Sequence, residues 1–262
     1  MPEPATLRGR HVLITRPQGR GVALASLLRA RGAEVTELPM LAIEPAGDPD
    51  EHRRVLQTAR NAYGWIFTST NAVTVAADLD SGPWPTLFAI GPATAAALAR
   101  LDRAPVQTAT QGHTSEALLR HPHFAQVGGK DVLLCSGAGG RTHLQEALRA
   151  RGAQVQKLEL YCRRAIRYPA PQIEAALAHV DTIVCTSAEG LHSLFEQTPA
   201  DARAAMLLPR LLVVPSVRVL ELAQRLGFAE VCVPRLLDDA TWADCLARTQ
   251  QGSPRNPFES QP

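Results

Sequence analysis

The chain repeats part of its own sequence, and this duplication limits the possible folds more than any other feature. Residues 9–38 align without gaps to residues 129–158, and 13 of these 30 positions are identical. Residues 66–69 match residues 184–187 further along, and a weaker third match continues the series in the same order. Self-similarity that recurs in one order indicates duplicated structural units. The sequence therefore predicts two halves that share one architecture.

Within each half, short apolar strands alternate with amphipathic helices. In the first half we expect a strand at 11–15, a helix at 21–31 and a strand at 34–38, with Gly32 as a left-handed helix cap. The second half repeats this order, beginning with a strand at 132–135. Such alternation predicts an α/β fold with parallel sheets that carry helices on both faces.

Two extended segments, 39–45 and 158–164, occupy equivalent places in the two halves. Each continues past the usual length of a strand into a mixed, β-favouring stretch. We expect the two segments to pair as a two-stranded hinge between two domains.

Charge and hydropathy argue against several classes of protein. The chain has 262 residues, of which 45% are hydrophobic, and its net charge is only +2. This balance argues against a dedicated nucleic-acid binder, although it allows a local basic cleft for a small anion. The sequence contains no run of 18 apolar residues and no pattern of a signal peptide at its start, so we expect a cytoplasmic protein without a membrane partner.

The five cysteines are scattered and include no C-x-x-C pair. In a chain without a signal peptide, this pattern predicts reduced thiols. The usual sequence motifs for a bound metal and for a catalytic serine are also missing, so we expect no metal. The cysteines are Cys135, Cys162, Cys185, Cys232 and Cys245.

One glycine-rich loop lies between a predicted strand and a predicted helix. Gly137 and Gly139 place backbone N–H groups at the start of that helix, and Arg141 adds a positively charged guanidinium group that can bind an anion through two N–H groups. An anion or carboxylate site, a plain tight turn and a nucleotide site all remain open. For a nucleotide, Glu159 lies 20 residues after Gly139, where a ribose-binding carboxylate is expected.

Other polar residues also follow strands and precede helices. Helix N-capping explains the serines, threonines and asparagine, and a solvated side chain explains the arginine. The same residues would equally well line a ligand cleft between the two lobes, because a capped helix N-terminus attracts anions. The residues of this group are Arg16, Thr68, Ser69, Asn71, Gly91, Thr186 and Ser187.

Four motifs follow one another in a fixed order. They are Phe67-Thr68-Ser69-Thr70-Asn71-Ala72-Val73, Ala89-Ile90-Gly91-Pro92-Ala93-Thr94-Ala95, Arg149 to Val155 leading to Tyr161, and Cys185-Thr186-Ser187. Together they resemble the uroporphyrinogen-III synthase family, and the resemblance runs from about residue 9 to residue 233.

The resemblance implies two flavodoxin-like domains with parallel sheets, joined by a two-stranded β-ladder. The implied parts are a discontinuous domain 1 (1–38 plus 165–250), hinge strands at 39–45 and 158–164, and domain 2 (46–157). The polar composition of the last residues predicts a disordered tail (251–262).

The resemblance also implies a reaction of haem biosynthesis. Hydroxymethylbilane, a linear tetrapyrrole with many carboxylates, loses water, inverts its ring D and closes to uroporphyrinogen III. The implied enzyme is a lyase without a metal or organic cofactor, and we expect a monomer. Without the protein the unrearranged isomer forms, so the main task of the protein is to hold the chain in the geometry that leads to inversion.

Several residues take roles from the resemblance. Tyr161 stands at the position of the family's hinge tyrosine and is the first candidate for the acid that assists loss of the hydroxyl. Thr94 matches the threonine of the first G-P-x-T loop and is a candidate catalytic contact. The second such loop is here Pro215-Ser216-Val217-Arg218, so either Ser216 replaces the threonine or the contact is dispensable. Thr68, Ser69, Thr186 and Ser187 would bind carboxylates.

Two other functions stay open from the residues alone. One is a two-lobed protein that binds a small anion such as a sugar phosphate or nucleotide. The other is a dinucleotide-dependent enzyme that uses the glycine-rich loop.

Overall fold

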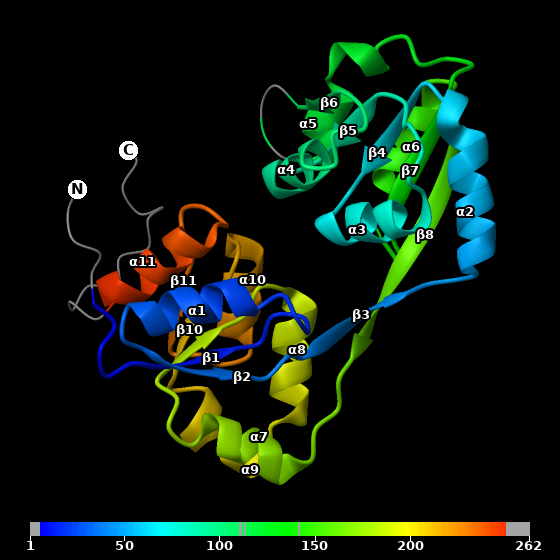
Figure 1. Cartoon of the computed structure of the whole chain (residues 1–262). Coiled ribbons are helices and arrows are strands. Elements are labelled where there is room, and N and C mark those ends of the chain that lie inside the picture. Colours follow the sequence, from blue (N-terminus) through cyan, green and yellow to red (C-terminus); the bar gives the residue numbers. More distant parts are fainter. Residues whose placement is uncertain (1–5, 110–111, 113, 141, 250–262) are drawn as a thin grey trace. The chain divides into compact units, whose positions relative to one another are not determined.

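The chain divides into two compact units, each built around one β-sheet (Figure 1). Unit 1 comprises Met1–Ala42 and Arg164–Pro262, and unit 2 comprises Ile43–Arg163. This computed structural model describes residues 6–109, 112, 114–140 and 142–249. Arg141 and the predicted tail 251–262 lie outside the described residues.

Unit 1 contains a five-stranded sheet in the order β11-β10-β9-β1-β2, in which every neighbouring pair is parallel. The strands are β1 (His11–Ile14), β2 (Glu34–Glu37), β9 (Thr182–Val184), β10 (Leu211–Val213) and β11 (Glu230–Cys232). The helices are α1 (Val22–Ala30), α7 (Ala170–Leu177), α8 (Ala188–Gln197), α9 (Ala200–Ala202), a π-helical turn (Arg203–Leu207), α10 (Val217–Arg225) and α11 (Asp239–Thr249).

Strand alternation divides the core of unit 1 between the two faces of the sheet. Leu13 of β1 belongs to the cluster that contains α7, α8 and α10 residues, whereas Val12 and Ile14 belong to the cluster with Leu24 of α1 and Trp242 of α11. Successive residues of a strand point to opposite faces. The sheet is therefore covered by α1 and α11 on one face and by α7, α8 and α10 on the other.

Unit 2 contains a six-stranded sheet in the order β3-β8-β7-β4-β5-β6, and the strands from β8 to β6 are parallel. The strands are β3 (Leu41–Pro45), β4 (Gly64–Phe67), β5 (Leu87–Ala89), β6 (Val106–Thr108), β7 (Asp131–Gly137) and β8 (Gln154–Ala165). The helices are α2 (Pro49–Thr58), a 3-10 turn (Ala59–Asn61), α3 (Thr70–Leu79), α4 (Pro92–Ala99), α5 (Ser115–Leu119), a second 3-10 turn (Pro122–Phe124) and α6 (His143–Ala150).

The core of unit 2 is divided in the same way. Leu133 of β7 packs in a cluster with Ala72 of α3 and Leu98 of α4, and Leu134 packs in a cluster with Leu118 of α5 and Leu148 of α6. Two layers of helices thus enclose a parallel sheet in this unit as well, and the predicted α/β class with parallel sheets is confirmed.

Helices α1 and α6, which the sequence aligns with one another, end in the same way. Gly32 and Gly152 both adopt a left-handed conformation, with φ of 94° and 83°. The N–H of Gly32 donates to Arg29 O at 2.9 Å, and the N–H of Gly152 donates to Arg149 O at 2.8 Å. Glycine is favoured at such a cap because it has no Cβ to clash.

The division between the units falls inside both β3 and β8, which are neighbours in the sheet. β8 is 12 residues long, about twice the usual length of a strand. The chain therefore passes from one unit to the other within these two strands.

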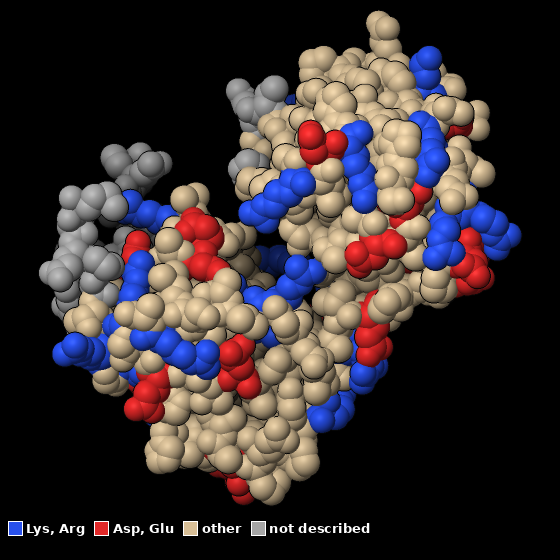
Figure 2. Space-filling model, in the orientation of Figure 1, with Lys and Arg blue, Asp and Glu red and all other residues tan. Residues whose placement is uncertain are grey.

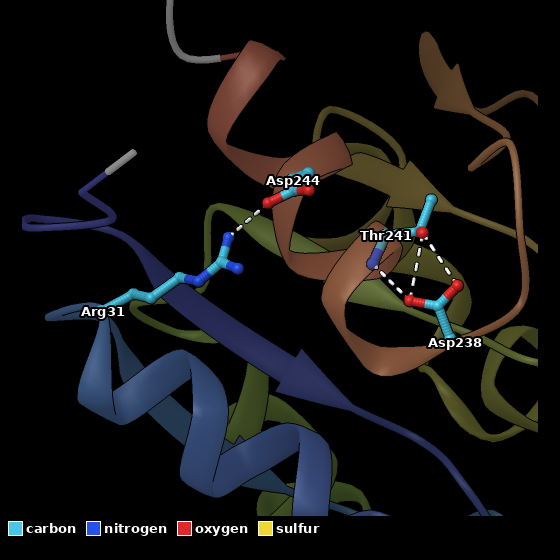
Figure 3. A network of polar contacts seen from close by, with 4 residues as sticks. All are labelled: Arg31, Asp238, Thr241 and Asp244. Carbon is cyan, nitrogen blue, oxygen red and sulfur yellow. Dashed lines mark hydrogen bonds and ion pairs between the residues drawn. The ribbon is translucent and has the colours of Figure 1, made fainter. Parts of the chain in front are cut away.

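Polar contacts cap the start of helix α11 and join α11 to the end of α1 (Figure 3). The carboxylate of Asp238 accepts the backbone N–H of Thr241 at 2.8 Å and caps the helix. Arg31, after α1, forms an ion pair with Asp244 at 2.6 Å. The cap stabilises the start of α11, and the ion pair with Arg31 helps to hold α11 beside α1.

The prediction that all five cysteines are reduced is wrong for one pair, because the structure joins Cys232 and Cys245 in a disulfide. Both side chains pack with the apolar cluster between the sheet and the α1–α11 layer. Spacing along the chain did not reveal this proximity, since it depends on how α11 folds back toward β11. Cys135, Cys162 and Cys185 are free thiols.

Candidate functional site

In unit 2, the polar residues of the predicted site gather where parallel strands end. Thr68 and Ser69 follow β4, Gly91 follows β5 and Gly137 ends β7. Because β4 lies between β7 and β5 in the sheet, these residues share one edge. Open α/β sheets bind ligands at the carboxyl ends of their strands.

Tyr161 reaches this edge because β8 contains a β-bulge. Ser136 of β7 pairs with Glu159, whereas the next residue, Gly137, pairs with Tyr161. Leu160 is therefore an extra residue on β8, and such a residue changes the face toward which the following side chains point. Tyr161 consequently packs with Leu158 in the cluster that contains α3, and it is 1% exposed.

The phenol of Tyr161 has close polar neighbours on two sides. Its oxygen lies 3.0 Å from Ser69 Oγ and accepts a hydrogen bond from Arg163 Nη2 at 3.4 Å. The guanidinium carbon of Arg163 also lies 5.8 Å from the centre of the ring. A Cβ on Gly137 would stand 2.6 Å from the ring, so the close approach requires glycine there. The motifs did not reveal Arg163, although its position two residues after Tyr161 on a strand was an available signal.

Helices α3 and α4 position the other candidates of this unit. Ser69 caps α3 by accepting the N–H of Ala72 at 3.2 Å, and Asn71 lies in the first turn. Gly91 occupies the N-cap position of α4, in which Thr94 is buried. The Thr68 hydroxyl donates to Cys135 O at 3.4 Å. The contacts of the described residues join Ser69 to Tyr161, and they do not join Thr94 to it.

The glycine-rich loop after β7 is held by Glu159. Gly139 adopts a φ of 67° and donates its N–H to Glu159 Oε1 at 3.3 Å, and Lys157 Nζ lies 2.6 Å from the same oxygen. The hydrogen bond from Lys157 lowers the pKa of Glu159. The carboxylate expected to bind a ribose is thus already used to hold the loop and the lysine, which argues against the nucleotide hypothesis.

In unit 1, the predicted residues also follow strands, but Arg16 is engaged within the protein. Its guanidinium pairs with Asp239 at 2.6 Å and lies 5.5 Å from the centre of the Trp242 ring, and the side chain is 13% exposed. Thr186 and Ser187 follow β9, and Ser187 caps α8 by accepting the N–H of Gly190 at 3.0 Å.

Ser216 follows β10 and stands at the N-cap position of α10, where its side chain forms no capping hydrogen bond. Its hydroxyl is therefore not used to hold the helix. The loop around it reads Pro215-Ser216-Val217-Arg218 in place of G-P-x-T, so the threonine hydroxyl is absent and Ser216 is the hydroxyl available there.

A hollow of about 1010 Å³ occurs elsewhere in unit 2. Its walls run from Thr58 and Asp131 to Arg149, Gln154 and Lys157, and they include none of the predicted site residues. It lies beside the beginnings of β7 and β8, whereas ligands of open α/β sheets bind at the ends of the strands. We therefore place the candidate site at the carboxyl edge and not in this hollow.

The described residues form neither a cluster of metal-ligating side chains nor a membrane-spanning helix. No group of three or more His, Cys, Asp or Glu side chains in that part could hold a metal ion. No helix among these residues has the length and hydropathy to cross a membrane. On the face shown in Figure 2, acidic and basic side chains are interspersed.

Two parallel-sheet units with polar residues after their strands place the chain in the class of open α/β proteins, whose ligands bind at the carboxyl ends of the strands. The profile of the family described as "Uroporphyrinogen-III synthase HemD" matches residues 22–240. The uroporphyrinogen-III synthase of Salmonella typhimurium (strain LT2) is 34% identical over 249 residues, which cover 92% of this chain and 99% of the relative. The chain belongs to the uroporphyrinogen-III synthase family.

Further relatives agree with this assignment. The uroporphyrinogen-III synthase of Escherichia coli (strain K12) is 31% identical over 248 residues, covering 92% of this chain and 99% of the relative. Among solved structures, a mutant uroporphyrinogen III synthase from Thermus thermophilus matches with a TM-score of 0.61 at 20% identity, covering 94% of this chain and 100% of that one. The Helicobacter pylori enzyme matches with a TM-score of 0.58 at 12% identity, covering 92% and 99%.

The comparisons confirm the family and the activity that the four motifs indicated. The chain has the activity of its family, that of a hydro-lyase of haem biosynthesis. The structural likeness supports the α/β fold with parallel sheets.

Proposed function

We propose that the chain converts hydroxymethylbilane to uroporphyrinogen III by loss of water and inversion of ring D, without a metal or organic cofactor. Loss of the hydroxyl gives an azafulvene, which is attacked by the substituted carbon of ring D. The resulting spiro intermediate fragments and recloses. The family membership supports this reaction.

Tyr161 is the proposed source of the proton that assists loss of the hydroxyl. The observation that carries this role is the phenol held at the carboxyl edge of the unit 2 sheet, 3.0 Å from Ser69 Oγ and in contact with Arg163. A positioned acid of this kind contributes about 10²–10⁴-fold to a rate. Thr94 is proposed as a second catalytic contact on α4.

The carboxylates of the substrate are proposed to bind at helix N-termini. Backbone N–H groups and the helix dipole favour anions there. In unit 2 the proposed binding residues are Thr68, Ser69, Asn71, Gly91, Gly137, Gly139 and Arg141, and in unit 1 they are Arg16, Thr186, Ser187 and Ser216. Arg16 would act here only if its ion pair with Asp239 opens.

The strands that run through the division between the units are proposed as the hinge, over 39–45 and 158–164. Domain 1 (1–38 plus 165–250) and domain 2 (46–157) would then be duplicated flavodoxin-like domains. We also propose that the protein is a cytoplasmic monomer.

Replacement of Tyr161 by phenylalanine tests the proposed acid, because it removes the hydroxyl and keeps the ring. We expect kcat for consumption of freshly made hydroxymethylbilane to fall about 10²-fold. Tyr63→Phe is the matched control, since it removes a phenol that donates to His123 O in the same unit, and it should keep kcat near that of the parent protein. An unchanged kcat in Tyr161→Phe would remove the acid role of Tyr161.

A further inference from the structure

We propose that Ser69 hands the proton to the substrate, and that Tyr161 and Arg163 act through it as a short relay. This inference rests on the proposed function and deepens it. It changes the role of Ser69 from a carboxylate ligand to the group that meets the departing hydroxyl.

Burial separates the roles of the two hydroxyl groups. Tyr161 is 1% exposed, its ring is covered by the backbone at Gly137, and a Cβ there would stand 2.6 Å from it. Ser69 is only half-buried, at the end of β4 and the start of α3. A proton on the phenol therefore has Ser69, 3.0 Å away, as its route toward a ligand at this edge.

The hydrogen bonds of Ser69 leave its own proton available. A serine hydroxyl can accept two hydrogen bonds and donate one. Ser69 Oγ accepts the N–H of Ala72 at 3.2 Å and lies 3.0 Å from the phenol oxygen of Tyr161, which in the proposed relay donates to the second acceptor position of Ser69. The proton of Ser69 then points to neither partner and can be donated to a substrate.

Arg163 sets the direction of the relay. A guanidinium donates hydrogen bonds and accepts none, so Arg163 Nη2 is the donor to the phenol oxygen at 3.4 Å and offers no acceptor for the proton of the phenol. The phenol then directs its own proton to Ser69. Once that proton has left, the positive charge of Arg163 stabilises the phenolate.

The proton transfers balance over the reaction. Ser69 gives its proton to the substrate hydroxyl, which leaves as water with the electron pair of the breaking carbon–oxygen bond. Ser69 regains a proton from Tyr161. The macrocycle closes when the unsubstituted α-carbon of ring D forms the last carbon–carbon bond, and the proton that this carbon loses returns to Tyr161 through Ser69.

A double-mutant cycle on the full-length chain tests the relay, with hydroxymethylbilane as the substrate. We expect Ser69→Ala and Tyr161→Phe each to lower kcat about 10²-fold with little change in KM. Because both residues serve one path, the double variant should be no slower than the slower single variant. Ser69→Thr, which keeps a hydroxyl and a capping group, should restore most of kcat.

Two controls separate the relay from helix capping. Ser69→Asn keeps an N-capping side chain but has no hydroxyl, so it should be as slow as Ser69→Ala. Thr114→Ala removes a cap of the same kind, on α5, and should keep the parental kcat.

Three results would overturn the relay. The first is a raised KM at unchanged kcat in Ser69→Ala, which would show that Ser69 contacts a carboxylate of the substrate. The second is a double variant in which the two losses of kcat multiply. The third is full activity in Ser69→Asn. A parent protein that forms no uroporphyrinogen III would instead contradict the proposed function itself.

Discussion

Gly137 and Tyr161 show how a single position can control the site. Gly137 ends β7 beneath the tyrosine ring, and the bulge at Leu160 brings that ring over it. The orientation of the phenol therefore depends on a residue that contributes no side chain.

We predict that Gly137→Ala lowers both stability and turnover. The added Cβ would stand 2.6 Å from the ring, and overpacking of this kind costs about 1–3 kcal/mol. Gly128→Ala is the matched control, because its Cβ would meet Arg151 O at an ordinary 3.5 Å. Urea unfolding and measurement of kcat for both variants check this prediction. A Gly137→Ala protein with the stability and kcat of the parent would contradict the close packing of the Tyr161 ring against Gly137.

The residues of the site could be predicted better than their contacts. Tyr161 and Ser69 stand in motifs that the sequence displays, but their hydrogen bond depends on the bulge, which strand alternation does not reveal. Without Leu160 as an extra residue, Tyr161 would point to the opposite face of the sheet. For Arg16 a ligand contact and a solvated side chain were both open, and the ion pair with Asp239 was not predicted because its partner lies 223 positions later in the chain.

Among the helices and strands, those that lie within the repeated segments could be predicted from the sequence. The aligned strands and helices were expected within a few residues of their observed ends, and Gly32 caps α1 as expected. Helices α2, α7, α9 and α11 lie outside the aligned segments and were not predicted.

The two aligned segments share a hydrogen bond from a helix arginine to a carbonyl of the following strand. Arg29 donates to Val35 O on β2 at 3.0 Å, and Arg149 donates to Val155 O on β8 at 2.9 Å. An arginine from the preceding helix thus satisfies a carbonyl of the following strand at the aligned position of each unit.

Asp238 makes the stability of α11 depend on pH. Hydrogen bonds from the N–H and hydroxyl of Thr241 lower the pKa of Asp238 below its usual value of 3.8. A lowered pKa in the folded state adds stability above that usual value, and this stability is lost as the pH falls through the folded value.

We predict that Asp238→Ala costs about 1 kcal/mol at neutral pH, the usual cost of losing an N-cap. The difference from the parent should shrink as the pH falls below 3.8. Asp238→Asn keeps a capping group without the charge, so it should retain most of the stability and lose the acid dependence. Urea unfolding followed by the fluorescence of the buried Trp242 checks this, and equal stability of parent and Asp238→Ala at all pH values would count against the cap.

For the whole molecule, the disulfide between Cys232 and Cys245 is the feature that the cysteine pattern of the sequence did not predict. We predict that protein denatured without a reductant is alkylated at three cysteines, namely Cys135, Cys162 and Cys185, and that reduction exposes Cys232 and Cys245 as well. Mass spectrometry of the alkylated chain gives the count. Five alkylated cysteines without reduction would contradict the disulfide and agree with the proposed cytoplasmic location, where disulfides are rare.

The central claim is that this chain directs the closure of a linear tetrapyrrole toward the inverted product. The most direct test supplies fresh hydroxymethylbilane, oxidises the products and separates the uroporphyrin isomers by chromatography. We predict that isomer III predominates and that its amount rises with added protein. Isomer I alone, formed at the rate of the reaction without protein, would contradict the account.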